Sequence, residues 1–339
     1  MSQFHYFIIK LLFILLATYI CIHLTMLLKV GIEALLLKPF KLKFREMSIF
    51  GYRFYKNNDG KWERNGRNPN GLTLAEPYFE VKNASPEELK SLDKRTHTFI
   101  LVTDVILLVI CIAAFIGCLI LRENTSLELF RSFLLWFGIT FLVRGIVSCI
   151  IGIYAIARVS SNTLSGYANR AINQYRAGVP LQTMDLKPEK DLDFKNVKDL
   201  DRLLYFPIYF SYCDMCEKFD ELAEAVTEYE KIRQPETSTT SDKVNSIYLT
   251  YYYSYHNIDP AKAQMYYSRA GKMLDQDKDA NGMRIKGFYY LNAMNDIEKA
   301  RECLSNAESS IDTYSIPVER ENERILITRL RKTIEEYNG

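Results

Sequence analysis

Residues 99–121 read FILVTDVILLVICIAAFIGCLIL, an apolar run that contains a single charged residue, Asp104. A helix needs about 20 apolar residues to cross the hydrocarbon core of a bilayer, and this run has 23. Two further runs, Phe7 to Leu28 and Leu129 to Ala157, are also apolar and long enough. The sequence therefore predicts a mainly α-helical protein with three transmembrane helices.

Charge is distributed unevenly along the 339 residues, although the net charge is only +2. The first 157 residues contain 18 basic and 12 acidic residues, and the last 182 contain 25 basic and 29 acidic residues. This division excludes a single water-soluble globule, a disordered chain, a coiled coil and a small disulfide scaffold. The second part has no basic stripe interleaved with aromatic residues, so we expect no nucleic-acid partner. The abundance of Ile, Lys, Tyr and Asn is typical of a low-GC bacterium.

Basic residues predict how the chain crosses the membrane, because cytoplasmic loops carry an excess of Lys and Arg. Residues 1–6 contain none, and the connection 122–128 contains only Arg122. The connection 38–96 contains thirteen. We therefore expect a multi-pass protein of the cell membrane with its N-terminus outside and its C-terminal domain in the cytoplasm.

The basic connection has a structure of its own. Residues 40–56 roughly alternate, and the following NNDGKWER predicts a β-hairpin with an Asp59–Gly60 turn. Such a hairpin would lie at the membrane surface or form an ordinary surface ribbon. Ser85 and Pro86 then predict the start of a short helix that leads into the second span. The expected divisions are 1–37, 38–96, 97–157, a linker 158–195, and a helical domain 196–339.

The final division has the features of a helical-repeat domain. Three similar segments, KFDELAEA, NIDPAKA and NDIEKA, place Ala223, Ala263 and Ala300 at equivalent positions, 40 and 37 residues apart. Small residues at such positions let neighbouring helices approach closely, as in tetratricopeptide-like arrays, which bind peptides or proteins along a concave face. A stripe of five tyrosines would line that face or belong to the core, and it consists of Tyr248, Tyr251, Tyr252, Tyr253 and Tyr255.

Charged and titratable residues within the predicted spans are candidate functional residues, because burying them in lipid is costly. His23 lies on the first span, Asp104 on the second and Arg144 on the third. Asp104 and Arg144 lie on antiparallel neighbours, so we expect an ion pair between them that holds the bundle together. Lys29 and Glu33 are four residues apart near the inner interface, and we expect a solvated pair.

The layout of the chain resembles the site-2 protease family of intramembrane zinc metalloproteases. The resemblance includes a first span with His23 followed by Gly31, a basic hairpin, two more spans and a Gly166-Tyr167-Ala168-Asn169 segment after the last span. It extends over nearly the whole chain and is closest to a bacterial subgroup with an appended helical domain. In that family, H-E-x-x-H and a later Asp-Gly motif supply two His and one Asp to zinc, and the Glu acts as general base.

The catalytic motifs of that family are substituted in this chain. The resemblance aligns His23 with the first His, but Leu24 stands at the Glu, Leu27 at the second His, and Ser165 at the Asp. One imidazole cannot supply the three protein ligands of a catalytic zinc site, so we expect no cofactor and no catalytic activity. The resemblance implies a pseudoprotease that binds a peptide or single-span client in the bilayer and a cytosolic protein through its repeats. An accessory subunit of a transporter or peptide-export system, bound to a permease or ATPase, is the alternative, and an active protease is a third hypothesis.

Overall fold

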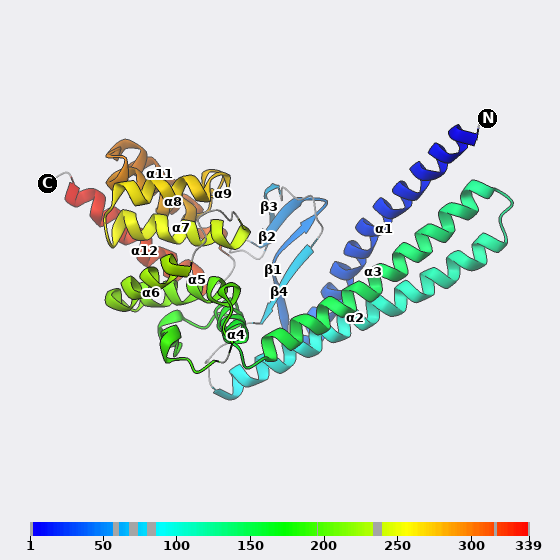
Figure 1. Cartoon of the computed structure of the whole chain (residues 1–339), viewed down its shortest axis with the longest axis horizontal. Helices are drawn as coiled ribbons and strands as arrows, with labels where there is room; N and C mark the ends of the chain where they lie inside the picture. Colours follow the sequence, from blue (N-terminus) through cyan, green and yellow to red (C-terminus); the bar gives the residue numbers. More distant parts are fainter. Residues whose placement is uncertain are drawn as a thin grey trace. The chain divides into compact units, whose positions relative to one another are not determined.

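The chain folds into two compact units, one ending at Arg158 and the other beginning at Val159. We call them the membrane unit and the helical unit. The computed structural model describes residues 3–56, 61–67, 74–79, 86–194, 196–232, 239–314 and 317–337. Both units are mainly helical, as predicted (Figure 1).

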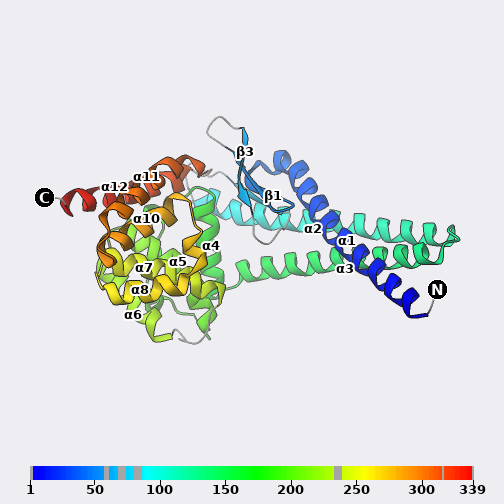
Figure 2. The ribbon, with the colours of Figure 1, turned by 90° about the horizontal axis from the view of Figure 1, so that it is seen from above.

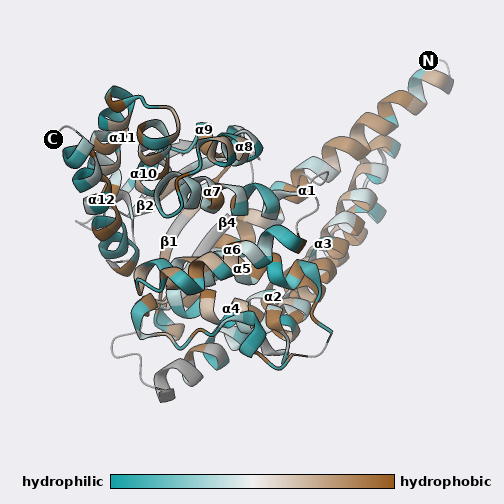
Figure 3. Ribbon diagram, turned by 60° about the vertical axis from the view of Figure 1, so that its left-hand side comes forward, coloured by the Kyte–Doolittle hydropathy of each residue, from teal (hydrophilic) through white to brown (hydrophobic). Residues whose placement is uncertain are grey.

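The membrane unit contains three long helices that match the predicted spans. They are α1 (Gln3–Phe40), α2 (Pro86–Glu123) and α3 (Glu128–Ser160). Each includes a stretch long and apolar enough to cross a membrane, and apolar residues cover all three (Figure 3). The predicted short helix at Pro86 is not separate, because α2 runs unbroken from Pro86 to Glu123. The membrane orientation stays a prediction.

A four-stranded antiparallel sheet lies between α1 and α2 in the sequence. Its strands are β1 (Leu42–Ile49), β2 (Tyr52–Lys56), β3 (Trp62–Arg67) and β4 (Leu74–Phe79), in the order β3-β2-β1-β4. The predicted Asp59–Gly60 turn lies outside the described residues. Strands β1 and β2 are joined by the tight turn Phe50–Gly51, in which both residues have positive φ, as two-residue hairpin turns of this hand require.

Three glycines of α3 allow it to pack closely against α2. Gly138, Gly145 and Gly152 are seven residues apart, and a Cβ atom on them would lie 3.0 Å from Cys118 Cβ, 2.8 Å from Cys111 Cβ and 2.0 Å from Asp104 Oδ2, respectively. The facing residues of α2 are also seven apart. A seven-residue repeat keeps one helix face in contact with a neighbour, and small residues bring membrane helices close together.

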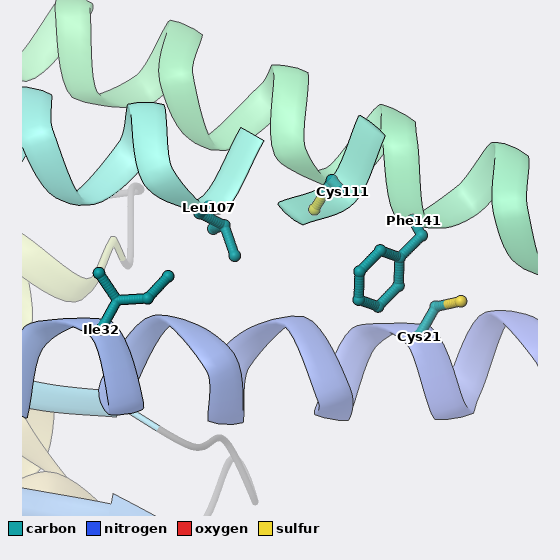
Figure 4. Packing of buried hydrophobic residues seen from close by; sticks show 5 residues of the cluster. All are labelled: Cys21, Ile32, Leu107, Cys111 and Phe141. Atoms are coloured by element: carbon teal, nitrogen blue, oxygen red, sulfur yellow. The ribbon is translucent and has the colours of Figure 1, made fainter. Parts of the chain in front are cut away.

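Helix α1 completes the core of the membrane unit. Cys21 and Ile32 of α1 pack with Leu107 and Cys111 of α2 and with Phe141 of α3 (Figure 4). Cys21 Sγ also donates a hydrogen bond to a backbone carbonyl of α3, at 3.2 Å. Side chains from all three helices therefore enclose one apolar core.

The helical unit consists of consecutive helices, several of which pack in pairs. The longer ones are α4 (Leu164–Arg176), α5 (Asp199–Met215), α6 (Phe219–Ile232), α7 (Thr240–Tyr255), α8 (Pro260–Ala270), α10 (Ala280–Phe288), α11 (Ile297–Ser310) and α12 (Pro317–Tyr337). Short helical turns are η1 (Leu181–Thr183), η2 (Glu189–Asp191), α9 (Lys272–Asp275), η3 (Tyr289–Ala293) and η4 (Ile311–Thr313). Helix α5 packs on α6, α7 on α8, and α10 on α11 (Figure 2). The stretch predicted as a linker contains α4, which packs on α5.

The residues that suggested repeats lie at helix contacts. Ala263 and Ala300 are fully buried near the starts of α8 and α11, whereas Ala223 is half-buried on α6. A tetratricopeptide-type repeat stays a prediction. The tyrosine stripe of α7 belongs mainly to the core, because Tyr251, Tyr252 and Tyr253 are buried.

A buried charge network joins α5 to the last helix of the unit. Asp214 Oδ1 lies 2.5 Å from Arg329 Nη1 and 3.1 Å from His256 Nε2, and Arg284 Nε lies 3.0 Å from Glu323 Oε2. Burial alone would raise the pKa of Asp214, but the hydrogen bond and charge of His256 and the charges of Arg329 and Arg284 hold it below its usual value. The ionised carboxylate is therefore stabilised by the fold.

We expect Gly145→Ala to destabilise the membrane unit by about 1–3 kcal/mol, because its methyl group would overpack the contact with Cys111. Gly117→Ala on α2 is the matched control, since a Cβ there meets nothing within 4 Å. Thermal unfolding of the purified chain in detergent measures both. Equal stability of the two variants would contradict the close packing of α2 and α3.

Removal of the Arg329 side-chain charge should destabilise the helical unit and make it more sensitive to acid. With a lowered pKa, Asp214 stabilises the fold above its ordinary pKa, and this contribution is lost as the pH falls through the folded pKa. In Arg329→Met the pKa of Asp214 rises, so unfolding begins at a higher pH, and stability at pH 7 falls by about 3 kcal/mol. Urea unfolding followed by near-UV circular dichroism of the buried tyrosines measures this.

Arg331→Met provides the control for that experiment, because Arg331 pairs with Glu308 on the surface, at 2.8 Å. Exposed pairs contribute about 1 kcal/mol or less. If the two variants lose the same stability, Asp214 is not held by Arg329 as the geometry indicates.

Candidate functional site

The predicted intramembrane residue Asp104 lies in a polar node that joins the three long helices. Lys29 Nζ on α1 donates to Asp104 Oδ1 at 2.9 Å, and Ser148 Oγ on α3 donates to the same oxygen at 2.8 Å. Lys29 Nζ also lies 3.3 Å from Ser148 Oγ. Asp104 Oδ1 of α2 thus accepts hydrogen bonds from side chains of both α1 and α3.

The predicted ion pair between Asp104 and Arg144 is wrong. The cation that reaches Asp104 is Lys29, and Arg144 Nε, which is buried, has no hydrogen-bond partner among the described residues. Ser148 lies one helical turn beyond Arg144 on α3, and its hydroxyl is the group that meets the carboxylate. The physical reason is position along the helix axis, because Gly145, beside Arg144, faces Cys111, which lies seven residues, or about 10 Å, along α2 from Asp104.

The predicted solvated pair of Lys29 and Glu33 is also wrong. Lys29 turns to α2 instead of to its own helix, and Glu33 is buried, with 8% of its surface exposed. The Lys29 side chain is 38% exposed and Asp104 only 3%. A buried hydrogen-bond acceptor without a partner is costly. The Lys29 ammonium group therefore binds Asp104, the more deeply buried of the two carboxylates.

Gly152 of α3 leaves the space in which the Asp104 carboxylate is buried. The second carboxylate oxygen, Oδ2, lies where a Cβ of residue 152 would be, 2.0 Å from that position. It has no hydrogen-bond partner among the described residues. Helix α3 also donates Cys149 Sγ to the backbone carbonyl of Asp104, at 3.2 Å.

His23 lies apart from this node, among aromatic rings. Its ring centroid is 4.5 Å from that of Tyr19 and 5.6 Å from that of Phe50. Its Nδ1 atom has no hydrogen-bond partner within the described part of the chain. No contact of the described residues connects His23 with Asp104 or Arg144.

The residues around His23 do not fit a catalytic zinc site. Leu24 and Leu27 offer no ligand atoms, and Ser165 belongs to α4 in the helical unit. Within the described residues, no group of three or more His, Cys, Asp or Glu could hold a metal ion. A catalytic zinc needs three protein ligands, which this donor set does not supply.

A groove in the helical unit was missed by the sequence interpretation. It has a cavity of about 400 Å³ between α5, α6 and the segment that contains η2. Four aromatic side chains line it, Tyr205, Phe206, Tyr209 and Tyr229. Four glutamates also line it, Glu189, Glu221, Glu224 and Glu228, with Lys190 and Arg202 as the only cations among its lining residues.

Each of the four glutamates has an ion-pair partner. Lys218 Nζ lies 3.4 Å from Glu221 Oε1, and Lys231 Nζ lies 2.6 Å from Glu228 Oε1. Lys190 Nζ contacts both carboxylate oxygens of Glu224, at 2.8 and 2.7 Å, and Arg202 Nε lies 2.7 Å from Glu189 Oε1. The hydrogen bond with Glu224 raises the pKa of Lys190. The spacing of Glu221, Glu224 and Glu228 on one helix face is visible in the sequence. It could have indicated an acidic surface, but not the aromatic side chains that α5 and α6 bring together.

No family model, curated protein or solved structure matches this chain significantly. The resemblance to the site-2 protease family therefore stays a prediction.

Double-mutant cycles in detergent can test which cation holds Asp104. We expect Lys29→Met and Asp104→Asn to show a coupling energy of about 1 kcal/mol or more, because the charges are in direct contact. Arg144→Met is the control and should show a coupling to Asp104→Asn near zero. A larger coupling for Arg144 than for Lys29 would restore the pairing expected from the sequence.

Proposed function

We propose that this chain is a non-catalytic membrane protein that holds a peptide or single-span client against the sheet and first helix of its membrane unit. The observation that carries the proposal is the contact between His23, in the middle of α1, and Phe50, in the turn between β1 and β2.

This contact indicates that the sheet runs back along α1. About 25 Å of helix separates His23 from the end of α1, at about 1.5 Å per residue, and the eight residues of β1 extend over about 26 Å. Strands β1 and β4 both pack against α1. The turn therefore reaches the depth of His23, within the apolar part of the first span.

The turn is apolar, which suits a position in lipid. It reads Ile49-Phe50-Gly51-Tyr52, and Phe50 is 51% exposed. Backbone away from water needs hydrogen-bond partners, and here the hairpin supplies them between its own strands. A half-exposed phenylalanine beside an apolar helix offers a contact surface for another apolar segment.

The sheet offers a second means of holding a client. Strand β3 lies at one edge of the strand order, and an extended peptide can bind such an edge by adding a strand. Side chains of β2 and β3 are in contact at this side of the sheet, since the Arg64 guanidinium of β3 lies 4.3 Å from the ring centroid of Tyr52 in β2. His23 supports the non-catalytic part of the proposal, because a lone imidazole among rings has neither the partner ligands nor the carboxylate that metalloprotease chemistry uses.

A photo-crosslinking experiment in native membranes tests this function. Benzoylphenylalanine at position 50 should trap a client whose crosslinked peptide, identified by mass spectrometry, comes from one single-span or exported peptide segment and is uncleaved. Benzoylphenylalanine at position 35 is the control, because Leu35 is also exposed on α1. It should not trap the same client.

Three results would contradict the proposal. Equal crosslinking at both positions would indicate chance contact, and a permease or ATPase trapped at position 50 would favour the accessory-subunit alternative. Stoichiometric zinc in the purified protein, lost in His23→Ala, would indicate a metalloprotease instead.

A further inference from the structure

Arg144 lies near the middle of the third span and has no counter-charge there. In the apolar run Leu129 to Ala157, fifteen residues precede Arg144 and thirteen follow it, so its backbone is about 20 Å from each end of the run, at about 1.5 Å per residue. Its Nε atom is buried and has no hydrogen-bond partner among the described residues, and no ion pair of Arg144 occurs among them. The client contact at Phe50 does not use this residue.

An unpaired guanidinium at this depth is costly. Arginine stays charged in proteins, and placing it at the centre of a membrane helix costs about 3 kcal/mol or more. The hydrocarbon core is about 30 Å thick, so lipid phosphates lie about 15 Å from its middle, farther than an arginine side chain extends. Charged residues inside spans accordingly pair with groups at their own depth. A carboxylate at the depth of Arg144 is the group that would neutralise it.

Arg144 lies at the edge of the three-helix bundle, where another helix can reach it. On one side, Phe141 points into the apolar core (Figure 4), and Ser148 belongs to the polar node. On the other side, Val147 is 38% and Ile151 60% exposed. These two residues lie about 60° and about 20° from Arg144 around the helix. The guanidinium therefore borders the lipid-facing side of α3.

The exposed apolar residues on that side of α3 have the spacing of a helix-packing face. They are separated by seven, four, four and three residues, and they are Trp136, Val143, Val147, Ile151 and Tyr154. Such spacing places side chains along one helix face, where they can pack against a second helix. Within the bilayer the partner segment must satisfy its own backbone hydrogen bonds. The occupant that fits is a transmembrane helix.

A second copy of this chain does not supply the missing carboxylate. The acidic residues in the interior of the described spans are Glu33 and Asp104, and both are buried. Asp104 also binds Lys29 within its own chain. The carboxylate that pairs with Arg144 must therefore come from a different protein.

We propose that the face of α3 around Arg144 binds a transmembrane helix of a partner protein that carries an aspartate or glutamate near the middle of its span. The carboxylate forms an ion pair with the guanidinium, and apolar side chains of the partner pack on Val147 and Ile151. This contact is separate from the client contact at Phe50 and does not rest on it.

The test measures binding of a synthetic membrane helix to the purified full-length chain in phosphatidylcholine vesicles. The peptide is dansyl-labelled, with one glutamate at the centre of about 20 leucines and a pair of lysines at each end. Energy transfer from Trp136 reports binding in a Trp62→Phe background, since these are the two tryptophans of the chain.

We expect the glutamate peptide to bind about threefold to thirtyfold more tightly than the same peptide with glutamine at its centre, the range of polar contacts between membrane helices. Arg144→Met should abolish this preference, and Arg144→Lys should keep part of it because the cation remains. Should Arg144→Met fail to fold, the comparison of the two peptides on the unmodified chain and on Arg144→Lys still decides the question.

Arg131→Met is the matched control, because it removes an arginine from the same helix near its start. It should leave the preference for glutamate unchanged. The proposal is overturned if the two peptides bind the unmodified chain equally, or if Arg131→Met abolishes the preference as Arg144→Met does. Loss of the preference when phosphatidylglycerol replaces part of the phosphatidylcholine would also overturn it, because Arg144 would then bind lipid phosphate instead of a partner helix.

Discussion

The close approach of α2 and α3 is the constraint on which the membrane unit depends. Glycine at every seventh position of α3 faces Cys118, Cys111 and Asp104 in turn. Where a β-carbon would have stood at position 152, the structure has the carboxylate of Asp104. Because that space exists, a charged group can be buried between helices and still meet Ser148 and Lys29. The polar node is therefore a consequence of backbone spacing as much as of charge.

The helical unit buries charge in a different way. Asp214 has a guanidinium and an imidazole within ion-pair distance, and a second buried pair, Arg284 with Glu323, lies among the same helices. Among the described residues of the membrane unit, Lys29 is the cation that reaches Asp104, and its side chain is partly exposed. A paired buried charge stabilises a fold only where the partners are fixed. The network of the helical unit fixes them with side chains from several helices, and the polar node of the membrane unit fixes them by helix contact.

Much of the architecture could be predicted from the sequence, because long apolar runs specify spans without reference to any other part of the chain. The three long helices α1, α2 and α3 followed from these local patterns, whereas the sequence left the α7 tyrosines open between the core and a concave face. The partner of Asp104 could not be predicted, since it depends on the register of α3 along α2 and on where α1 packs against the pair. The aromatic groove depends likewise on two helices that meet only after folding. The seven-residue glycine spacing was present in the sequence, and it would have indicated the α2–α3 contact.

Helix α1 has two separate contact faces. One face packs in the three-helix bundle, and the other contacts the turn that carries the proposed function. Lys29 follows His23 by six residues, which places the two side chains about 120° apart around the helix and about 9 Å apart along it. The face with Lys29 and Ile32 meets α2 and α3, whereas His23 meets the turn of the sheet. Changes at Phe50 or His23 thus leave the glycine contacts and the polar node intact. A client that binds at the turn would be held by a surface whose rigidity comes from another face of the same helix.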